Sequence, residues 1–396
     1  MARYFDKSFT QQESLPEASL ESAMKVLQHG RLHRYNVTDD EDSETSLLEK
    51  EFADYLGVKY CLAVASGGYA LSCALRAVGA QPNDPILTNA FTLAPVPGAI
   101  ASLGAQPILV EINKDLVIDF DDLNRKINES NSKVLLLSHM RGHICDMEEL
   151  TALCQKRKVL LIEDCAHTMG GNWNGVNSGL HGLISCYSTQ TYKHLNSGEG
   201  GLLVSNDSDI MAKAIILSGS YMLFDRHIAR PELENFFHPK FDFPNCSGRM
   251  DNLRATILRP QLRELSKKCS EWDSRYRTIE RILGKNNRIG LIQRSEKEGF
   301  VGSSIQFYLD GITSNEIMGF IGRCKARGVE LKWFGDKDPK GYTSRYESWK
   351  YIPPQDCPNT KAFMATLLDM RIPLSFSLSD CELIATIIVE EIGELN

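Results

Sequence analysis

The feature that most constrains the fold of this chain is an alternation of short apolar runs with helical stretches across its first half. The apolar runs lie at 60–64, 85–88, 107–112, 134–138 and 159–162. The stretches with apolar residues at helical spacing lie between them, at 70–79, 95–103, 119–129 and 147–157. Short strands separated by helices predict an α/β fold with a mainly parallel sheet covered by helices on both faces.

Small and polar residues follow several of these apolar runs. They include Ser66 with Gly67 and Gly68 after the first run, His139 after the fourth, and Asp164 after the fifth. Ligands of such sheets bind beyond the carboxyl ends of the strands. We therefore expect these side chains to converge at one edge of the sheet.

The regions before and after this alternation divide the chain. Residues 12–57 are predicted to be helical with an interruption at 30–43, and two further apolar runs, 183–187 and 201–204, have no full helix between them. A long helical region near 250–282 leads to a smaller part, with strands at 303–309 and 329–332 and helices at 314–327 and from 379. We predict a large domain over 1–260, which includes the N-terminal helical segment, and a small C-terminal α/β domain over 261–396.

Composition excludes several classes of protein. A chain of 396 residues that is 42% apolar can bury a large core, and a net charge of −7 argues against nucleic-acid binding. No segment is long and apolar enough for a membrane span or a signal peptide. The 11 cysteines include no CxxC pair, which indicates free thiols in a reducing compartment and no zinc site. We expect a cytoplasmic protein without metal, nucleic-acid or membrane partners.

Two residues indicate the chemistry of the site. Asp164 ends a buried strand, and Lys193 lies between a Ser-rich segment and the Gly-rich turn 198–201. A lysine can hold pyridoxal phosphate as a Schiff base, and a buried aspartate can keep the ring nitrogen of that cofactor protonated. Taken alone, Asp164 could equally be a helix cap or an ion-pair partner, and Lys193 a surface lysine.

Two other segments fit the same cofactor. The turn Ser66, Gly67, Gly68 and Tyr69 precedes a predicted helix, where free N–H groups bind phosphate, although tight turns of this kind are common without a ligand. Ser188 lies shortly before the lysine and can reach a phosphate. His167 follows Asp164 and could lie beside the ring or be a packed histidine.

The order and spacing of these segments resemble the DegT/DnrJ/StrS aminotransferases, from about residue 20 to the end. The most specific parts are 162–167 (Ile-Glu-Asp-Cys-Ala-His) and 193–201, where the lysine is followed after four residues by Gly-Glu-Gly-Gly. The resemblance implies a fold type I pyridoxal-phosphate transferase. It also implies an amino-acid donor such as glutamate or glutamine, a keto acceptor, and pyridoxamine phosphate as the intermediate form of the cofactor.

The resemblance assigns roles to individual residues. Lys193, Asp164 and His167 would be catalytic. Residues that would contact the cofactor are Gly67, Gly68, Tyr69, Phe91, Leu93, Asp164, His167, Ser188, Lys193 and Ser247. Family members share active sites across a homodimer, so Ser247 and Arg249 would serve the neighbouring subunit, and the Phe-rich loop 236–243 is a candidate interface segment.

Departures from the family pattern concentrate where substrate is expected. Gly68 replaces a threonine, Leu93 stands at the position of a ring-stacking aromatic, and Phe91 lies two positions earlier. We expect Arg141, Arg249, Lys332 and Trp333 to contact the substrate, because Arg and Lys suit phosphates and Trp suits a sugar or base face.

The sequence therefore predicts an aminotransferase whose acceptor is a keto-sugar, either free or linked to a nucleotide, or a related keto compound. Two alternatives stay open. One keeps the cofactor but catalyses elimination, dehydration or decarboxylation, since the reaction depends on which bond lies perpendicular to the ring. The other is a non-catalytic, regulatory protein with the same fold, which fold alone never excludes.

Overall fold

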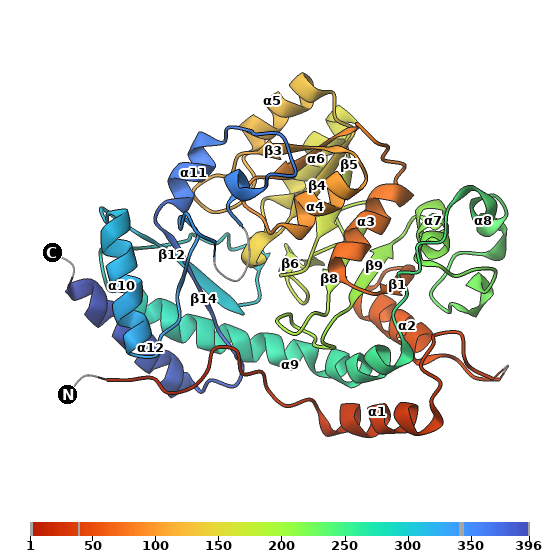
Figure 1. The fold of residues 1–396 in the computed structure, drawn as a ribbon, viewed down its shortest axis with the longest axis horizontal. Coiled ribbons are helices and arrows are strands. Elements are labelled where there is room, and N and C mark those ends of the chain that lie inside the picture. Colours follow the sequence, from red (N-terminus) through yellow and green to blue (C-terminus); the bar gives the residue numbers. More distant parts are fainter. Residues whose placement is uncertain (1–2, 39, 340–343, 395–396) are drawn as a thin grey trace.

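A seven-stranded mixed sheet forms the centre of the protein, whose computed structural model describes residues 3–38, 40–339 and 344–394 (Figure 1). Its strands follow the order β1-β9-β8-β5-β4-β2-β3. Strand β9 runs antiparallel to β1 and β8, and the other pairs are parallel. The strands are β1 (Tyr60–Val64), β2 (Pro85–Asn89), β3 (Gln106–Val110), β4 (Val134–Ser138), β5 (Leu160–Asp164), β8 (Ile184–Ser188) and β9 (Gly201–Ser205). The predicted α/β fold with a mainly parallel mixed sheet is confirmed.

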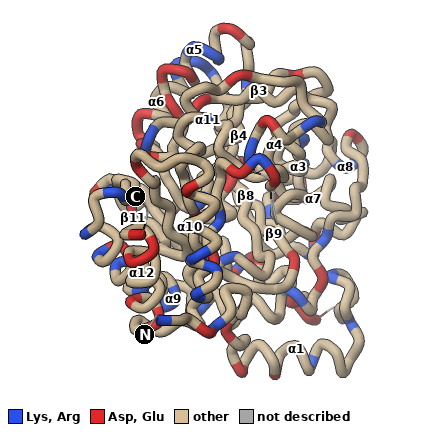
Figure 2. The backbone as a smooth tube through the Cα atoms, turned by 60° about the vertical axis from the view of Figure 1, so that its left-hand side comes forward, with Lys and Arg blue, Asp and Glu red and all other residues tan. Residues whose placement is uncertain are grey.

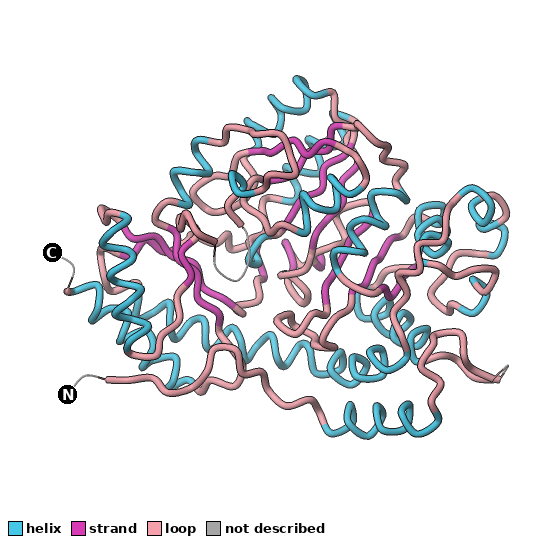
Figure 3. The backbone as a smooth tube through the Cα atoms, viewed as in Figure 1, coloured by secondary structure: helices cyan, strands magenta, loops and turns pink. Residues whose placement is uncertain are grey.

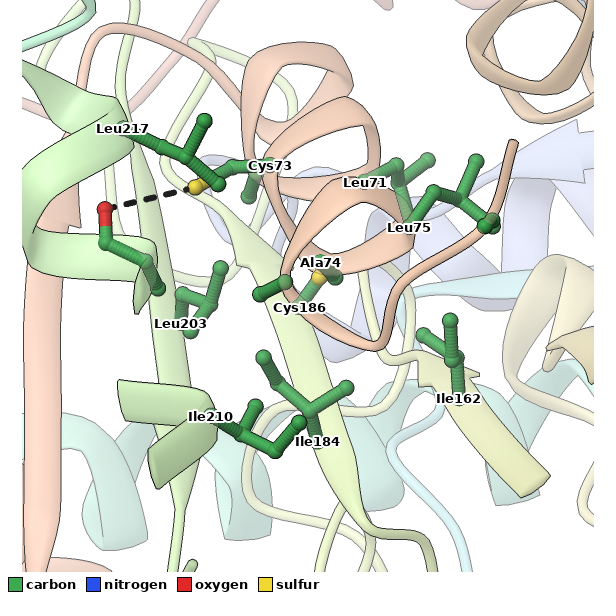
Figure 4. Close-up of a cluster of buried hydrophobic side chains, with 14 of the residues drawn as sticks. Leu71, Cys73, Ala74, Leu75, Ile162, Ile184, Cys186, Leu203, Ile210 and Leu217 are labelled. Atoms are coloured by element: carbon green, nitrogen blue, oxygen red, sulfur yellow. Dashed lines mark hydrogen bonds between the residues drawn. The ribbon is translucent and has the colours of Figure 1, made fainter. Parts of the chain in front are cut away.

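Helices cover both faces of this sheet. One face packs against α3 (Gly67–Ala77), α4 (Pro95–Ser102) and α7 (Ser208–Ser218). Figure 4 shows this core, in which Leu71 and Leu75 of α3 lie above Ile162 and Ile184 of neighbouring strands. The alternate strand residues, such as Leu135 and Leu161, face α5 (Phe120–Ser130) and α6 (Met147–Arg157) on the opposite side. The period-two alternation of each strand thus places apolar side chains in two separate layers.

The N-terminal helices form as the sequence predicts. They are α1 (Glu17–His29) and α2 (Glu44–Leu56), separated by the predicted interruption. Helix α2 begins where the side chain of Ser43 accepts a hydrogen bond from the N–H of Ser46, and it ends at Gly57, whose φ of 73° is left-handed. Helix α2 packs with part of α9 on β1 and β9.

A small unit follows, built on a four-stranded antiparallel sheet in the order β10-β12-β14-β13. Its elements are β10 (Ile289–Leu291), β12 (Ser304–Leu309), β13 (Lys332–Trp333), β14 (Leu367–Arg371), α10 (Ser314–Ala326) and α12 (Leu378–Gly393). Strand β14, at the centre of this sheet, is absent from the sequence prediction. The strand predicted at 329–332 lies at Lys332–Trp333 instead.

Helix α9 (Asn252–Leu283) connects this small unit with the large unit, which comprises the seven-stranded sheet and its helices (Figure 3). Its first turns pack through Leu258 and Leu262 in the large unit, and its last turns pack through Ile279 and Leu283 in the small unit. The division between the units therefore falls within this helix. Phe5 and Phe9, at the start of the chain, pack in the core of the small unit, and the domain bounds 1–260 and 261–396 stay a prediction.

Shorter elements complete the fold. They are β6 (Asn172–Trp173), β7 (Val176–Asn177), β11 (Glu298–Gly299), α8 (Pro239–Asp242) and α11 (Pro358–Met364). Strand β11 pairs with β6, which links the two units by backbone hydrogen bonds. Basic and acidic residues are interspersed along the surface elements (Figure 2). In the part of the chain that the structure describes, no helix combines the length and the apolar character that a membrane span requires.

Candidate active site

A cavity of about 910 Å³ opens between the carboxyl edge of the large sheet and the small unit. It brings together most of the site residues predicted from the sequence. Those that line it are Gly67, Gly68, Leu93, Arg141, Asp164, His167, Ser188, Lys193 and Lys332. The expected convergence of strand ends at one edge is therefore present in the fold.

Lys193 projects into this cavity from a loop that is tied at its base. The N–H of Thr189 donates to the carbonyl of Gly200 at 2.9 Å, and the N–H of Lys193 donates to the carbonyl of Gln190 at 2.8 Å. The backbone of Gly200 has a φ of 157°, and a side chain there would collide with the hydroxyl of Thr189. The loop can close only because a glycine occupies this position.

The amine of Lys193 has a lowered pKa. Burial lowers its pKa to about 8, and the nearby charges of Arg141 and Arg371 act in the same direction, against the opposing effect of Asp164. An amine with a pKa near 8 is partly deprotonated at neutral pH, whereas an exposed lysine is not. The deprotonated form is the one that adds to a carbonyl group.

His167 contacts this amine directly. Its Nε2 lies 2.8 Å from the Nζ of Lys193, while its Nδ1 accepts a hydrogen bond of 3.4 Å from the N–H of Arg141. When the lysine amine is neutral, the ring hydrogen on Nε2 can be donated to it; when the amine is charged, Nζ donates to Nε2 instead. Burial, followed by the charge of Lys193, holds the pKa of His167 well below its usual value, so the ring stays neutral.

Asp164 lies at the bottom of the cavity, at the end of β5. One carboxylate oxygen accepts from the hydroxyl of Ser138 at 2.9 Å, and the other accepts from the N–H of Ala166 at 3.1 Å. Burial raises the pKa of this carboxyl group, and the charge of Lys193 opposes the shift. A buried carboxylate with only neutral donors bonded to it is well suited to a cationic ring nitrogen.

The predicted phosphate turn closes the other end of the cavity. The hydroxyl of Ser66 accepts from the N–H of Tyr69 and caps the N-terminus of α3. Gly67 lies against Ser188, and a Cβ at Gly67 would approach the Cβ of Ser188 to 2.8 Å. The free N–H groups of a helix start and a serine hydroxyl therefore meet at one point.

Five predicted contact residues lie elsewhere. Phe91 is fully buried and packs edge-on against Phe334, with ring centroids 5.0 Å apart. The cofactor contact expected of Tyr69 is through its backbone and stays a prediction; its side chain points away, since its hydroxyl donates to the carbonyl of Leu217. Trp333 donates its indole N–H to the carbonyl of Ala365 and packs in the core of the small unit. Among neighbours on a strand only alternate side chains share a face, so Lys332 lines the cavity and Trp333 does not.

The remaining two are Ser247 and Arg249. Ser247 is exposed, and Arg249 donates to the carbonyl of Gly219 at 2.8 Å while stacking over Tyr221. Neither belongs to the lining of this cavity. Their role toward a neighbouring subunit stays a prediction.

Sequence reasoning missed the contribution of β14. Asp369 and Arg371 of this strand line the cavity, and Asp369 pairs with Arg141 at 2.6 Å. The signal was present in the sequence Leu-Leu-Asp-Met-Arg (367–371), where apolar residues at 368 and 370 alternate with charged residues at 369 and 371.

Three buried side chains have potential ligand atoms close enough together to hold a metal ion. They are His139, Glu163 and Cys165. The carboxylate of Glu163 is already occupied, however. It accepts from the backbone N–H groups of Gly179, His181 and Gly182, and it bonds to His139 at 3.0 Å. Glu163 therefore fixes the connection between β5 and β8, on which the loop of Lys193 is built.

Known proteins with similar sequences identify the family to which the chain is related. The sequence profile of the DegT/DnrJ/EryC1/StrS aminotransferase family matches residues 16–389. GDP-perosamine synthase of Vibrio cholerae is 33% identical over 253 residues, which are 64% of this chain and 62% of that enzyme. UDP-2-acetamido-2-deoxy-3-oxo-D-glucuronate aminotransferase of Pseudomonas aeruginosa is 30% identical over 240 residues, 60% of this chain and 61% of the relative. The matches thus span less than two thirds of the length of these curated relatives.

Solved structures share the fold over nearly the whole chain. An aminotransferase from Psychrobacter cryohalolentis superposes with a TM-score of 0.85 at 19% identity and covers 98% of this chain and 100% of its own. A Helicobacter pylori aminotransferase involved in the biosynthesis of pseudoaminic acid gives a TM-score of 0.84 at 17% identity, with coverage of 99% and 100%. At these identities the likeness establishes the fold.

Proposed function

Because this chain belongs to the DegT/DnrJ/EryC1/StrS aminotransferase family, we propose that it is a pyridoxal-phosphate-dependent aminotransferase, with glutamate or glutamine as donor and a keto-sugar as acceptor. The observation that carries the proposal is the placement of three groups around one cavity. They are the amine of Lys193 with a lowered pKa, the buried carboxylate of Asp164, and the turn at Gly67 against which Ser188 packs.

The residues present fit pyridoxal phosphate. Gly67 packs so closely on Ser188 that a Cβ there would collide with it, and both residues line the cavity beside the start of α3, where backbone N–H groups can bind a phosphate. When bound, the cofactor supplies a ring that stabilises negative charge at the reacting carbon of the substrate. Asp164 would keep the ring nitrogen protonated, and Leu93, which lines the cavity while Phe91 is buried, would cover the ring.

Lys193 would act in two ways in this proposal. Its amine would hold the cofactor before substrate arrives, and after release it would move a proton at the carbon that gains or loses the amino group. His167, held neutral by burial, would orient the free amine through the Nε2 contact of 2.8 Å. Neither step requires a residue outside the cavity lining.

The names of the relatives favour a sugar acceptor. They include a GDP-perosamine synthase and an aminotransferase of a UDP-linked oxo-glucuronate. A cavity of about 910 Å³ has room for such a sugar beside the cofactor.

We further infer a cytoplasmic homodimer with shared sites. In the loop 236–243, Phe236 is buried and stacks on Phe224, whereas Phe237 and Phe241 are 57% and 76% exposed. Exposed aromatic side chains of this size are typical of protein interfaces. Ser247 and Arg249 would then complete the cofactor site of the neighbouring subunit.

The first test of the proposal is a spectrum of the purified, cofactor-loaded protein before and after addition of glutamate or glutamine. We expect the absorbance band of the bound cofactor to shift to that of pyridoxamine phosphate, with one equivalent of keto acid released. A lyase would release product without accumulating the pyridoxamine form. A protein that binds the cofactor but does not react with any common amino acid would favour the non-catalytic alternative.

Substituting Asp164 tests the proposed role of its carboxylate. We expect Asp164→Asn to lower the rate of the half-reaction by about 10²–10³-fold, the range measured for removal of one preorganised electrostatic contact. The rate is measured by stopped-flow absorbance. Ser138→Ala, which removes one hydrogen bond but keeps the charge, is the control and should cost about ten-fold at most. Equal rates in Asp164→Asn and the unmodified protein would contradict the role.

A further inference from the structure

We propose that Gln306, a buried residue on β12 of the small unit, is a positioning residue for Lys193. It would act through residues 141–144 (segment 141–144), which follow β4 and lie beside His167. By holding this segment in place, Gln306 would keep His167 against the reacting amine. The inference rests on the proposed function and deepens it, because it adds a residue that acts on the site from the small unit.

Segment 141–144 of the large unit is bonded along its whole length to the small unit. Each of its residues bonds to a different side chain from β12, from β14 or from the chain between β10 and β12. The bonds are Arg141 to Asp369 at 2.6 Å, the carbonyl of Gly142 to Arg294 at 2.7 Å, His143 to Gln306 at 2.8 Å, and the N–H of Ile144 to Glu298 at 2.9 Å. The place of this segment is therefore set by the small unit as well as by β4.

Gln306 connects two of these four bonds. Its amide nitrogen donates to the carboxylate of Asp369 at 2.7 Å and to the hydroxyl of Ser304 at 2.9 Å, so its amide oxygen faces His143. Because an amide oxygen only accepts, the Nε2 of His143 donates to it. Burial holds the pKa of His143 well below its usual value, so the ring is neutral. One buried amide thus fixes His143 and, through Asp369, the guanidinium of Arg141.

The backbone of the segment is strained where it meets His167. Arg141 has a φ of 56° and Gly142 a φ of 80°, both left-handed. A residue with a side chain keeps this unfavourable conformation only where the surrounding structure holds it. In this conformation the N–H of Arg141 donates to the Nδ1 of His167 at 3.4 Å, and a Cβ at Gly142 would approach the carbonyl oxygen of His167 to 3.1 Å. The bonds from the small unit supply the restraint that this conformation requires.

His167 connects this segment with the reacting amine. The imidazole ring is bonded to Arg141 through Nδ1, and its Nε2 lies 2.8 Å from the Nζ of Lys193. The charge of Arg141 acts on the same amine. Burial lowers the pKa of Lys193 to about 8, and among the charged groups around it Arg141 and Arg371 act in the same direction and Asp164 against it. A displacement of the segment would therefore change both the orientation and the pKa of the amine.

Holding the two units together does not by itself account for these polar groups. The units are already joined by α9 and by the pairing of β11 with β6. A buried amide and imidazole contribute little more to stability than apolar side chains of the same shape, because both lose their hydrogen bonds to water on folding. Unlike apolar contacts, however, their hydrogen bonds have a fixed direction. The position of these bonds beside His167 favours a positioning role.

Replacing Gln306 with methionine tests this role. Methionine fills a similar space but can neither donate to Asp369 nor accept from His143. We expect the half-reaction with glutamate to slow by roughly 10- to 100-fold, the cost of misplacing a reacting group by about 1 Å. We also expect the pKa of Lys193 to rise from about 8 toward its ordinary value of 10.5, because Arg141 is no longer held beside the amine. Loss of a residue that only stabilised the fold would change neither quantity.

Two measurements give these quantities. Stopped-flow absorbance of the cofactor-loaded protein gives the rate of the half-reaction. Competitive labelling with acetic anhydride over a range of pH, quantified for each lysine by mass spectrometry, gives the pKa of Lys193 in the full chain without cofactor. Lys297, which lies outside the cavity, is the internal reference in the same samples, and its pKa should be the same in every variant.

Three further variants assign the effect to these bonds. Tyr308→Phe removes another hydrogen bond between β12 and the large unit, from the Tyr308 hydroxyl to the carbonyl of Lys114 at 2.9 Å, and should change neither quantity. His143→Gln keeps a donor for the amide oxygen of Gln306 and should retain most of the rate. His143→Phe removes that donor and should act in the same direction as Gln306→Met, which keeps the test decisive if Gln306→Met folds poorly. Circular dichroism verifies the fold of each variant.

Three results would overturn the positioning role. They are an unchanged rate and an unchanged pKa of Lys193 in a folded Gln306→Met protein, a lower rate with an unchanged pKa, and equal losses in Tyr308→Phe. Because the labelling needs neither cofactor nor turnover, it is independent of the half-reaction. A protein in which Gln306→Met raises the pKa of Lys193, but which does not react with amino acids, would contradict only the proposed function.

Discussion

Replacing Lys193 with alanine is expected to lower amino transfer by roughly 10⁴-fold, the upper end of the contribution of a single acid–base group. The loss is large because one amine would both hold the cofactor and move the proton. His167 cannot replace it, since burial holds the pKa of His167 well below its usual value. Turnover with glutamate and an acceptor measures the effect.

The spectrum of the variant gives a second readout. Lys193→Ala should lose the absorbance band of the lysine-bound cofactor while still binding the cofactor through the turn at Gly67 and Ser188. Lys297→Ala is the matched control, because Lys297 is a partly exposed lysine paired with Glu148 outside the cavity. A Lys193→Ala protein that kept its turnover would remove the basis of the proposed function.

The largest expected effect on stability follows from Glu49→Gln. The carboxylate of Glu49 is bonded to both terminal nitrogens of Arg34, at 2.8 and 2.9 Å, and neither side chain is exposed. It also accepts from the N–H of Ala63 on β1. A neutral glutamine leaves the guanidinium of Arg34 buried without its counter-charge, which costs about 3–5 kcal/mol in the free energy of unfolding.

Urea unfolding followed by circular dichroism measures this loss. Glu51→Gln is the control, because Glu51 pairs with Arg259 and Arg263 near the surface and should cost about 1 kcal/mol or less. The double variant Arg34→Met and Glu49→Leu removes both charges and should recover much of the stability. If Glu49→Gln were as stable as Glu51→Gln, the buried pair would have no such role.

The same residue sets part of the acid sensitivity of the protein. Burial acts to raise the pKa of Glu49, but the charges of Arg34 and His227 outweigh it and hold the pKa at about 2, below the ordinary value of 4.5. A group with a lowered pKa in the folded state stabilises the fold above the ordinary value. That contribution is lost as pH falls from about 4.5 through about 2. Glu49→Gln should therefore lose less stability over this interval.

The sequence predicts the large unit well because its signals are local. Strands β1 and β4 fall at the residues predicted, since each is an apolar run bounded by turn residues. Lys193 and Asp164 meet in one cavity because the carboxyl ends of neighbouring strands must lie at one edge.

The small unit is predicted less well because side-chain direction there depends on strand register. The strand predicted at 329–332 lies at Lys332–Trp333, and a change of one residue in register moves each side chain of a strand to the other face of the sheet. Because β14 was not predicted, Arg371, which lies on it, was not predicted to line the cavity. Phe91 and Leu93 were both expected to contact the cofactor, and Leu93 lines the cavity, whereas the turn after β2 carries Phe91 into a core cluster with Phe334.

One consequence of α9 concerns how wide the cavity can open. The cavity has one wall on each unit, and the two units share this uninterrupted rod of 32 residues. Any change in the angle between the walls must bend α9, whose weakest point is Pro260, where the proline ring removes one backbone hydrogen bond. The stiffness of α9, together with the pairing of β11 with β6, would thus limit how far the two walls can separate.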